Sequence, residues 1–168
     1  MLNSYQDKFM KQIWEYKDIK KLRESIGNKK IVLVGGCFDV IHLGHTTFLE
    51  KAKNKGDILI VLLESDENIK KNKGNNRPIN NQENRAILLT KFKMVDYVIN
   101  LPKVINDNEY LEIVKEIKPT IIAVSENDQN LINKKKQAKL VGAKLIKVTN
   151  LIPHQSSSRI IEIIAENS

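Results

Sequence analysis

The sequence predicts an α/β fold, a Rossmann-like parallel sheet of five strands flanked by helices. Five short runs contain mostly Ile, Val and Leu with little polar alternation, which is typical of strands covered on both faces. Helical patterns separate these runs, and strands that alternate with helices form right-handed βαβ units. A length of 168 residues is within the range of one domain and allows a sizeable core.

The elements are expected in a definite order along the chain. An imperfect apolar stripe at the start predicts an amphipathic helix of one or two pieces over residues 6–27, with Phe9, Ile13, Trp14, Ile19, Leu22 and Ile26 on its apolar side. Strands are predicted at 30–35, 57–64, 95–101, 120–125 and 144–149, and helices at about 45–55, 81–93, 107–117, 129–141 and 157–166. Residues 69–81 predict a loop of low complexity. We therefore divide the chain into a helical lead-in, 1–28, and a single domain, 29–168.

Composition and charge narrow the class of protein. Lys and Arg number 28 against 20 Asp and Glu, which gives a net charge of +8 and favours anionic ligands. No apolar run approaches the ~20 residues of a membrane span, and the first residues lack the apolar core of a signal peptide. The single cysteine, Cys37, excludes an internal disulfide and a multi-thiolate zinc site. We expect a cytoplasmic protein without a membrane partner.

A nucleic-acid-binding protein is the alternative class that a basic chain raises. Lys134, Lys135 and Lys136 fall on one predicted helix and would form a patch for phosphates. However, four Phe, four Tyr and one Trp offer little material for base stacking, and no nucleic-acid motif occurs. Nucleic acid is therefore not expected as a partner.

Two histidines mark the candidate site. The segment GGCFDVIHLGHTTFLEKAKNKG, residues 35–56, follows the first predicted strand and enters a helix. Ligands of parallel sheets bind beyond the carboxyl ends of the strands, where glycines allow close approach and free helical N–H groups face anions. The spacing of three residues puts His42 and His45 on the same side of a helical turn.

Three roles are open for this histidine pair. The rings can pack or cap the helix, although Phe48, Leu49 and Ala52 already supply its buried stripe. They can ligate zinc, with Asp39 or Cys37 as a third ligand. They can also donate hydrogen bonds to phosphoryl oxygens on which negative charge grows in a transition state. Four roles are open for Asp39. It can be a buried structural residue, orient a histidine, bind a metal, or act on the ribose or the acceptor.

Three sequence blocks resemble a known family. His42-Leu43-Gly44-His45 resembles the H-x-G-H motif of the cytidylyltransferase-like nucleotidyltransferases. SDENIKKNKGNNRPINNQENR, residues 65–85, resembles the lysine-bearing loop and arginine helix of the heptose-1-phosphate adenylyltransferases. SSSRII, residues 156–161, resembles the Ser/Thr-rich start of the family's last helix. The blocks occur in the family's order, and the resemblance covers about residues 28–165.

The resemblance implies transfer of a nucleotidyl group from a nucleoside triphosphate, with ATP favoured, to a phosphorylated small molecule such as a sugar 1-phosphate. The acceptor would attack the α-phosphorus in line and release pyrophosphate, with Mg²⁺ on the triphosphate. The catalytic residues implied are His42, His45, Lys73 and Arg85. The nucleotide-binding residues implied are Gly36, Cys37, Phe38, Gly44, Ser156, Ser157 and Ser158. The substrate-binding residues implied are Asp39, Lys70, Arg77, Arg85 and Glu126, and no metal ligands are assigned.

Local patterns place these side chains. The lysines of the second block fall in the predicted loop, closed by Gly74, where they can fold over phosphates. Asn80, with a glutamate three residues later, predicts a helix start that puts Arg85 beside the crevice. Arg77 has an alternative to substrate binding, which is to stabilise the loop. The following proline restricts the backbone of Arg77 to extended conformations. The serines at 156–158 are good N-cap residues, and their hydroxyl groups can bind phosphate.

The nucleotide and the acceptor are less well defined. Cys37 and RPIN, residues 77–80, resemble the adenylyltransferases, and residues 148–155 lack the arginine of glycerol-3-phosphate cytidylyltransferases. VSENDQN, residues 124–130, replaces the glycine–aspartate turn of those families. The alternatives are a CTP-dependent glycerol-3-phosphate-type cytidylyltransferase, an FMN adenylyltransferase and a non-catalytic nucleotide-binding sensor. The apolar side of residues 9–26 also leads us to expect a homodimer. His154 matches no motif and is expected at the surface.

Overall fold

The computed structural model describes residues 12–103, 106–150 and 155–166, so the expectations for Phe9 and His154 lie outside the described residues. The centre of the fold is a six-stranded sheet of order β1-β4-β3-β2-β5-β6 in which all paired strands are parallel. Its strands are β1 Ile13–Glu15, β2 Ile31–Gly36, β3 Ile58–Leu63, β4 Tyr97–Asn100, β5 Ile121–Ser125 and β6 Lys144–Thr149. The predicted fold class is confirmed, and β2 to β6 are the five strands expected.

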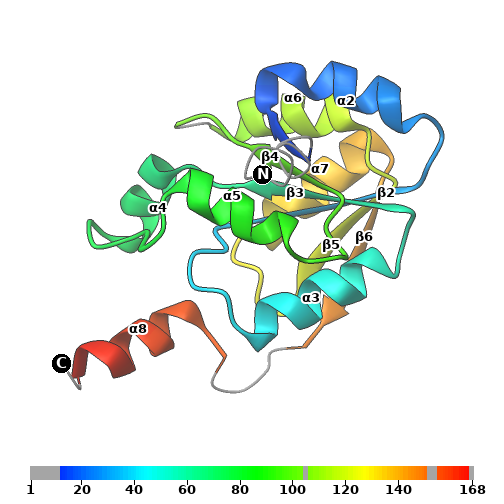
Figure 1. The fold of residues 1–168 in the computed structure, drawn as a ribbon. Helices are drawn as coiled ribbons and strands as arrows, with labels where there is room; N and C mark the ends of the chain where they lie inside the picture. The colour runs from blue at the N-terminus through cyan, green and yellow to red at the C-terminus, as the bar shows by residue number, and fades with distance from the viewer. Residues whose placement is uncertain (1–11, 104–105, 151–154, 167–168) are drawn as a thin grey trace, which may run out of the picture.

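Helices cover both faces of this sheet, as Figure 1 shows. They are α2 Ile19–Ile26, α3 Leu43–Lys53, α4 Asp66–Lys73, α5 Gln82–Thr90, α6 Asp107–Ile117, α7 Leu131–Val141 and α8 Ser157–Glu166. Helices α2, α6 and α7 contribute to one buried apolar cluster, and α3 and α5 contribute to the other. None of the helices in the described part of the chain has the length and apolarity needed to cross a bilayer.

The two clusters follow from the alternation of side chains along each strand. In β2, Ile31 and Leu33 join the α2–α6–α7 cluster, whereas Val32 and Val34 join the α3–α5 cluster. All six residues of β3 are buried, in the same alternating way. Continuous apolar runs are therefore required here, because a strand with helices on both faces has no solvent side.

The first strand corrects the expectation for the lead-in. Residues 13–15 were expected in a helix, but they form β1 and pair in parallel with β4, with Ile13 opposite Val98. After a 3-10 turn at Tyr16–Asp18, the expected helix begins at Ile19 and buries Ile19, Leu22 and Ile26. The exposed edge of β4 explains the difference, since its unpaired backbone groups give a short β-branched and aromatic segment a hydrogen-bonding partner.

The lysine-rich segment after β3 is also corrected. Its lysines were expected in a loop, but Lys70, Lys71 and Lys73 lie on α4. The Ser65 hydroxyl caps the start of that helix by accepting from the Asn68 N–H, and Gly74, at φ +94°, follows its end. The start of α5 differs from the expectation by one residue, because Asn81 caps it.

The order of the strands determines where a ligand can bind. The chain runs outward from β2 through β3 to β4, and then returns to place β5 on the other side of β2. The loops after β2 and β5 therefore diverge and leave a crevice at the carboxyl end of the sheet. The histidine segment, residues 37–42, fills the loop after β2. Helix α8 extends away from the sheet below this edge (Figure 1).

Candidate functional site

The turn after β2 brings the backbone against the site. A Cβ atom on Gly35 would lie 2.6 Å from the hydroxyl oxygen of Tyr110, so a larger residue there would collide with that hydroxyl group. Three residues later the chain turns at Phe38, whose φ of +46° is unusual for a bulky side chain. The buried Phe38 ring supports the turn from below, in the α3–α5 cluster.

His42 is the N-cap of α3. Its Nδ1 accepts a hydrogen bond of 3.1 Å from the backbone N–H of Gly44. A Cβ atom on Gly44 would lie only 2.9 Å from the imidazole ring, so glycine leaves room for the ring over the first turn. Burial lowers the pKa of His42, so the ring is neutral at pH 7. A neutral imidazole whose Nδ1 accepts must carry its proton on Nε2, which makes Nε2–H a donor.

His45 stacks on His42 one helical turn later. The ring centroids are 3.9 Å apart and the planes differ by 30°. The His45 ring also lies against the Phe38 ring, with 5.2 Å between the centroids and the planes tilted by 50°. Burial, followed by the neighbouring His42 and Lys73, lowers the pKa of His45 to about 3. Two stacked imidazoles can coexist here because neither is protonated at neutral pH.

The depressed pKa of His45 predicts a pH-dependent stability. In the unfolded chain the imidazole has its ordinary pKa of 6.5 and is protonated below that pH. In the folded chain it is protonated only near pH 3. The contribution of the neutral His45 ring to the free energy of unfolding is therefore complete above pH 6.5 and is lost progressively as the pH falls towards 3. Urea midpoints at pH 7.5 and 5.0 should differ more for the wild type than for His45→Asn. Equal differences in the two proteins would contradict this account.

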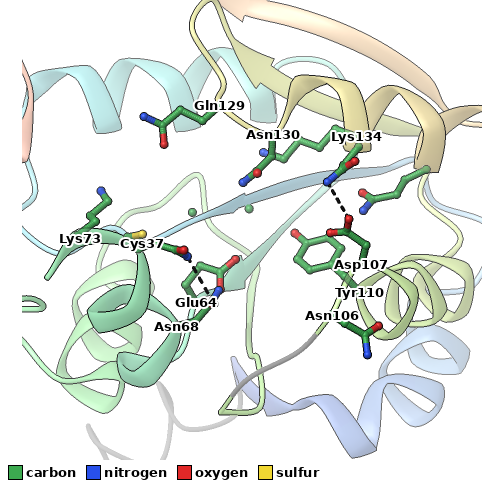
Figure 2. A pocket seen from close by; sticks show the side chains of 15 residues that line it. Cys37, Glu64, Asn68, Lys73, Asn106, Asp107, Tyr110, Gln129, Asn130 and Lys134 are labelled. Atoms are coloured by element: carbon green, nitrogen blue, oxygen red, sulfur yellow. Dashed lines mark hydrogen bonds between the residues drawn. The ribbon is translucent and has the colours of Figure 1, made fainter.

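Two adjoining cavities open at this edge of the sheet, and they share Gly35, Gly36 and Cys37. The smaller has a volume of about 240 Å³ and is lined by both histidines, Gly44, the Phe38 and Phe48 rings, and residues that follow β5 and β6. The larger has a volume of about 410 Å³ and is lined by α4, α6, α7 and the end of β3, as Figure 2 shows. The two cavities thus meet over the glycines at the end of β2.

Asp39 has a structural role in this turn. Its carboxylate is buried and accepts hydrogen bonds from the backbone N–H groups of Ile79 and Asn80 and from the Arg77 guanidinium at 2.7 Å. Burial alone would raise its pKa, but these donors outweigh burial and hold the pKa below its usual value. Asp39 is only 1% exposed and lines neither cavity, so the expectations of a metal or substrate contact do not fit its position. Arg77 lines neither cavity and braces residues 77–80, as its alternative role requires.

Arg85 is fully buried, which corrects the expectation of substrate contact. Its guanidinium donates to the backbone oxygens of Asn80, Cys37 and Glu64 and to the carboxylate of Asp66 at 2.6 Å. The side chain therefore joins the ends of β2 and β3 to the start of α4. It lines neither cavity.

The remaining expected residues lie at different depths. Lys73 is exposed and lines the larger cavity, whereas the exposed Lys70 lines neither cavity. Glu126 lies outside both cavities and pairs with Lys147 at 3.1 Å. Cys37 lines both cavities, and burial raises the pKa of its thiol, although Lys73 opposes this.

One of the three serines, Ser157, connects α8 to the histidine turn. The Ser156 hydroxyl accepts from the backbone N–H of Arg159, as a helix cap does. The Ser157 hydroxyl donates to the backbone oxygen of Val40 at 2.9 Å, while Ser158 is exposed. No serine of this group lines either cavity, but the preceding Gln155 lines the smaller one.

Comparison with known proteins identifies the family. The family model described as Cytidylyltransferase-like matches residues 33–163. The chain belongs to this family. Two relatives are the Bifunctional protein HldE of Campylobacter jejuni subsp. doylei, 39% identical over 142 residues, and of Helicobacter pylori, 38% identical over 149 residues. These alignments cover 83% and 87% of this chain but only 28% and 30% of the relatives. The chain therefore spans less than a third of their length.

Solved structures agree with this family membership. A lipopolysaccharide core biosynthesis protein from Thermoplasma volcanium is 28% identical, with a TM-score of 0.59 over 76% of this chain and 100% of that chain. A pantoate-beta-alanine ligase from Francisella tularensis shares the fold, with a TM-score of 0.62 and 20% identity over 92% of this chain and 76% of that chain. The chain thus has the fold of the cytidylyltransferase-like family to which its sequence assigns it.

Several cavity residues of this family member were missed by sequence reasoning. Seven carboxamide side chains line the larger cavity: Asn68, Asn72, Asn106, Gln129, Asn130, Asn133 and Gln137. Glu64 lies among them with Oε2 accepting from Asn68 at 2.5 Å, and Tyr110 faces Gly35. Glu64 could have been identified by its place directly after β3. The carboxamides carry no such signal, because they come from two helices, α4 and α7, and from the residues before α6 and α7, and match no motif.

Proposed function

We propose that this chain transfers a nucleotidyl group, favouring AMP from ATP, to the phosphate of a small polar acceptor such as a sugar 1-phosphate. The observation that carries the proposal is the position of the two histidines. Stacked and neutral, they stand at the N-terminus of α3, beside the floor that both cavities share. Two substrates bound in adjoining cavities would meet at this point.

The chemistry of the histidines fits displacement at phosphorus. Such a reaction needs hydrogen-bond donors directed at the oxygens where negative charge grows, and it needs no covalent intermediate with the protein. The Nε2–H of His42 can supply one donor, since Nδ1 is occupied by the N–H of Gly44. The positive end of the α3 dipole favours the same anion. A phosphate on the acceptor is already nucleophilic at neutral pH, so no general base is required.

Other groups would hold the phosphates. Lys73 lies on the rim of the larger cavity as a cation for the acceptor phosphate or the triphosphate. Bound Mg²⁺ would neutralise the leaving pyrophosphate, and it commonly enters such sites with the phosphates. Because Asp39 is buried outside both cavities whereas Glu64 lines the larger one, Glu64 is our candidate for a protein ligand. The α8 serines support the histidine turn and remain candidates for the nucleotide phosphates.

The two cavities suggest how the substrates divide. The smaller one has aromatic walls that suit a base and ribose, and it contains the histidines. The larger one is rich in carboxamides, which both donate and accept hydrogen bonds and so suit hydroxyl groups. The resemblance of Cys37 and residues 77–80 to heptose-1-phosphate adenylyltransferases favours ATP and a sugar phosphate. The lipopolysaccharide core biosynthesis protein among the similar structures is consistent with a sugar acceptor.

Pyrophosphate release tests the proposal. The chain is incubated with Mg²⁺, with ATP or CTP, and with heptose 1-phosphate, glycerol 3-phosphate, phosphocholine or FMN. We expect pyrophosphate and an equal amount of nucleotide sugar from ATP and heptose 1-phosphate. Release with CTP and glycerol 3-phosphate alone, or with ATP and FMN alone, would replace the proposal by that alternative. Nucleotide binding without pyrophosphate from any pair would favour the sensor.

A further inference from the structure

Lys134 would belong to a surface patch under the nucleic-acid alternative, but the structure buries it. Only 7% of this α7 residue is exposed, whereas the two lysines that follow it are exposed. Its Nζ lies 2.7 Å from Oδ2 of Asp128, whose side chain is also largely buried. A lysine is seldom buried to this extent without a partner, so the carboxylate accounts for its position.

This ion pair spans the wall between the two cavities. Asp128 lines the smaller cavity, which contains the histidines, and Lys134 lines the larger one. The other carboxylate oxygen, Oδ1, accepts from the backbone N–H of Asn130 at 2.9 Å, so the carboxylate is fixed from two sides. An ammonium group carries three N–H donors, and Asp128 is its hydrogen-bonding partner within the described residues. The remaining donors are available to a ligand of the larger cavity.

The opposite wall of the larger cavity carries a lysine of different character. Lys73 comes from α4, is exposed, and forms no ion pair in the described parts of the chain. Figure 2 shows Lys73 and Lys134 on opposite sides of the cavity, with Cys37 on the side of Lys73. Lys73 is near enough to the histidines for its charge to lower the pKa of His45. An unpaired cation suits a phosphate, whereas a lysine neutralised by a carboxylate suits a neutral oxygen.

We propose that Lys134 is a specificity-determining residue, which donates a hydrogen bond to a hydroxyl oxygen of the acceptor at the end remote from its phosphate. The inference rests on the proposed function, because it assigns the larger cavity to the acceptor. The neighbouring amides of Asn130 and Asn133 line the same wall and offer further partners for hydroxyl groups. Lys134 thus favours acceptors that are long enough to reach α7 when their phosphate is bound near Lys73.

Steady-state kinetics on the full chain test this assignment. Lys134→Met should raise the KM for heptose 1-phosphate about 10- to 100-fold, as expected for a lost hydrogen bond to a charged donor. The KM for ATP should change by less than about threefold, and Lys135→Met, on the exposed side of α7, should behave as wild type. The KM for a pentose 1-phosphate, which lacks the distal carbons of the heptose, should change little in Lys134→Met. Equal losses for both sugars, or an equal effect of Lys135→Met, would overturn the proposal.

A double variant separates binding from a structural role. Lys134→Met alone leaves the buried Asp128 carboxylate unpaired, which can distort the fold. The double variant Asp128→Asn/Lys134→Met removes both charges, and Asp128→Asn is its reference. If Lys134 contacts the acceptor, the KM for heptose 1-phosphate stays raised in the double variant. Recovery of the reference KM would show that Lys134 only neutralises Asp128, and would overturn the proposal.

Calorimetry distinguishes failure of this inference from failure of the proposed function. Absence of nucleotidyl transfer by the wild type would count against the proposed function. Titration of heptose 1-phosphate into the full chain without nucleotide then tests Lys134 independently. Binding that weakens in Lys134→Met but not in Lys135→Met supports the inference. No binding by the wild type, or equal binding by wild type and Lys134→Met, overturns it.

Discussion

His42→Ala is expected to lower kcat for nucleotidyl transfer by about 10² to 10³, the usual effect of removing one well-placed donor from a developing anion. The KM for the nucleotide should change much less, because the interaction strengthens only as charge grows in the transition state. Initial rates of pyrophosphate release at saturating ATP and acceptor measure the effect. His45→Ala should fall in the same range, since its ring holds His42 by stacking.

His42→Asn is the matched control for this result. Asparagine is a good N-cap and can accept from the Gly44 N–H as His42 does, but its shorter amide group cannot place an N–H at the position of Nε2–H. His42→Asn should therefore keep the stability of the wild type and lose activity as His42→Ala does. Normal activity in this variant would show that His42 only caps α3, and the proposed mechanism would fail.

Arg85→Met should lower the free energy of unfolding by about 3–5 kcal/mol, the range seen when one partner of a buried ionic group is removed. The change leaves three backbone oxygens and the Asp66 carboxylate without their donor. Methionine fills much of the arginine's volume, so loss of packing contributes little. Urea denaturation monitored by circular dichroism measures the difference.

Arg159→Met serves as the control for this stability effect. Arg159 is exposed on α8, and its removal should change the free energy of unfolding by less than about 0.5 kcal/mol. If Arg85→Met were as stable as this control but raised the KM of a substrate, Arg85 would have the substrate role that the family resemblance implied. The buried position of Arg85 predicts the opposite outcome.

Local patterns were sufficient for the parts of the fold whose determinants are local. The strands β2 and β3 are continuous apolar runs, and the turn into α3 is defined by its glycines and the histidine spacing. Each of these can be identified within a window of a few residues. The family motif then adds the chemistry of the turn, which periodicity alone could not supply.

Long-range contacts explain what local patterns missed. Three residues cannot show a period, and Ile13–Glu15 is a strand only because β4, 85 residues away, offers an edge. Arg85 looked like a substrate ligand because nothing near it in sequence reveals the three separate segments that its guanidinium joins. Lys134 looked like a surface lysine because its burial depends on the conformation of the turn that positions Asp128.

The hydrogen bond from Ser157 to Val40 has a consequence for biosynthesis. It joins positions 117 residues apart, so the histidine turn is made early but obtains this support only when the ribosome has added α8. The core of the sheet does not depend on this bond, because none of the buried core residues in the described part of the chain lies on α8. A nascent chain can therefore complete its core while the turn that carries His42 still lacks this contact, which would separate the acquisition of stability from the acquisition of activity.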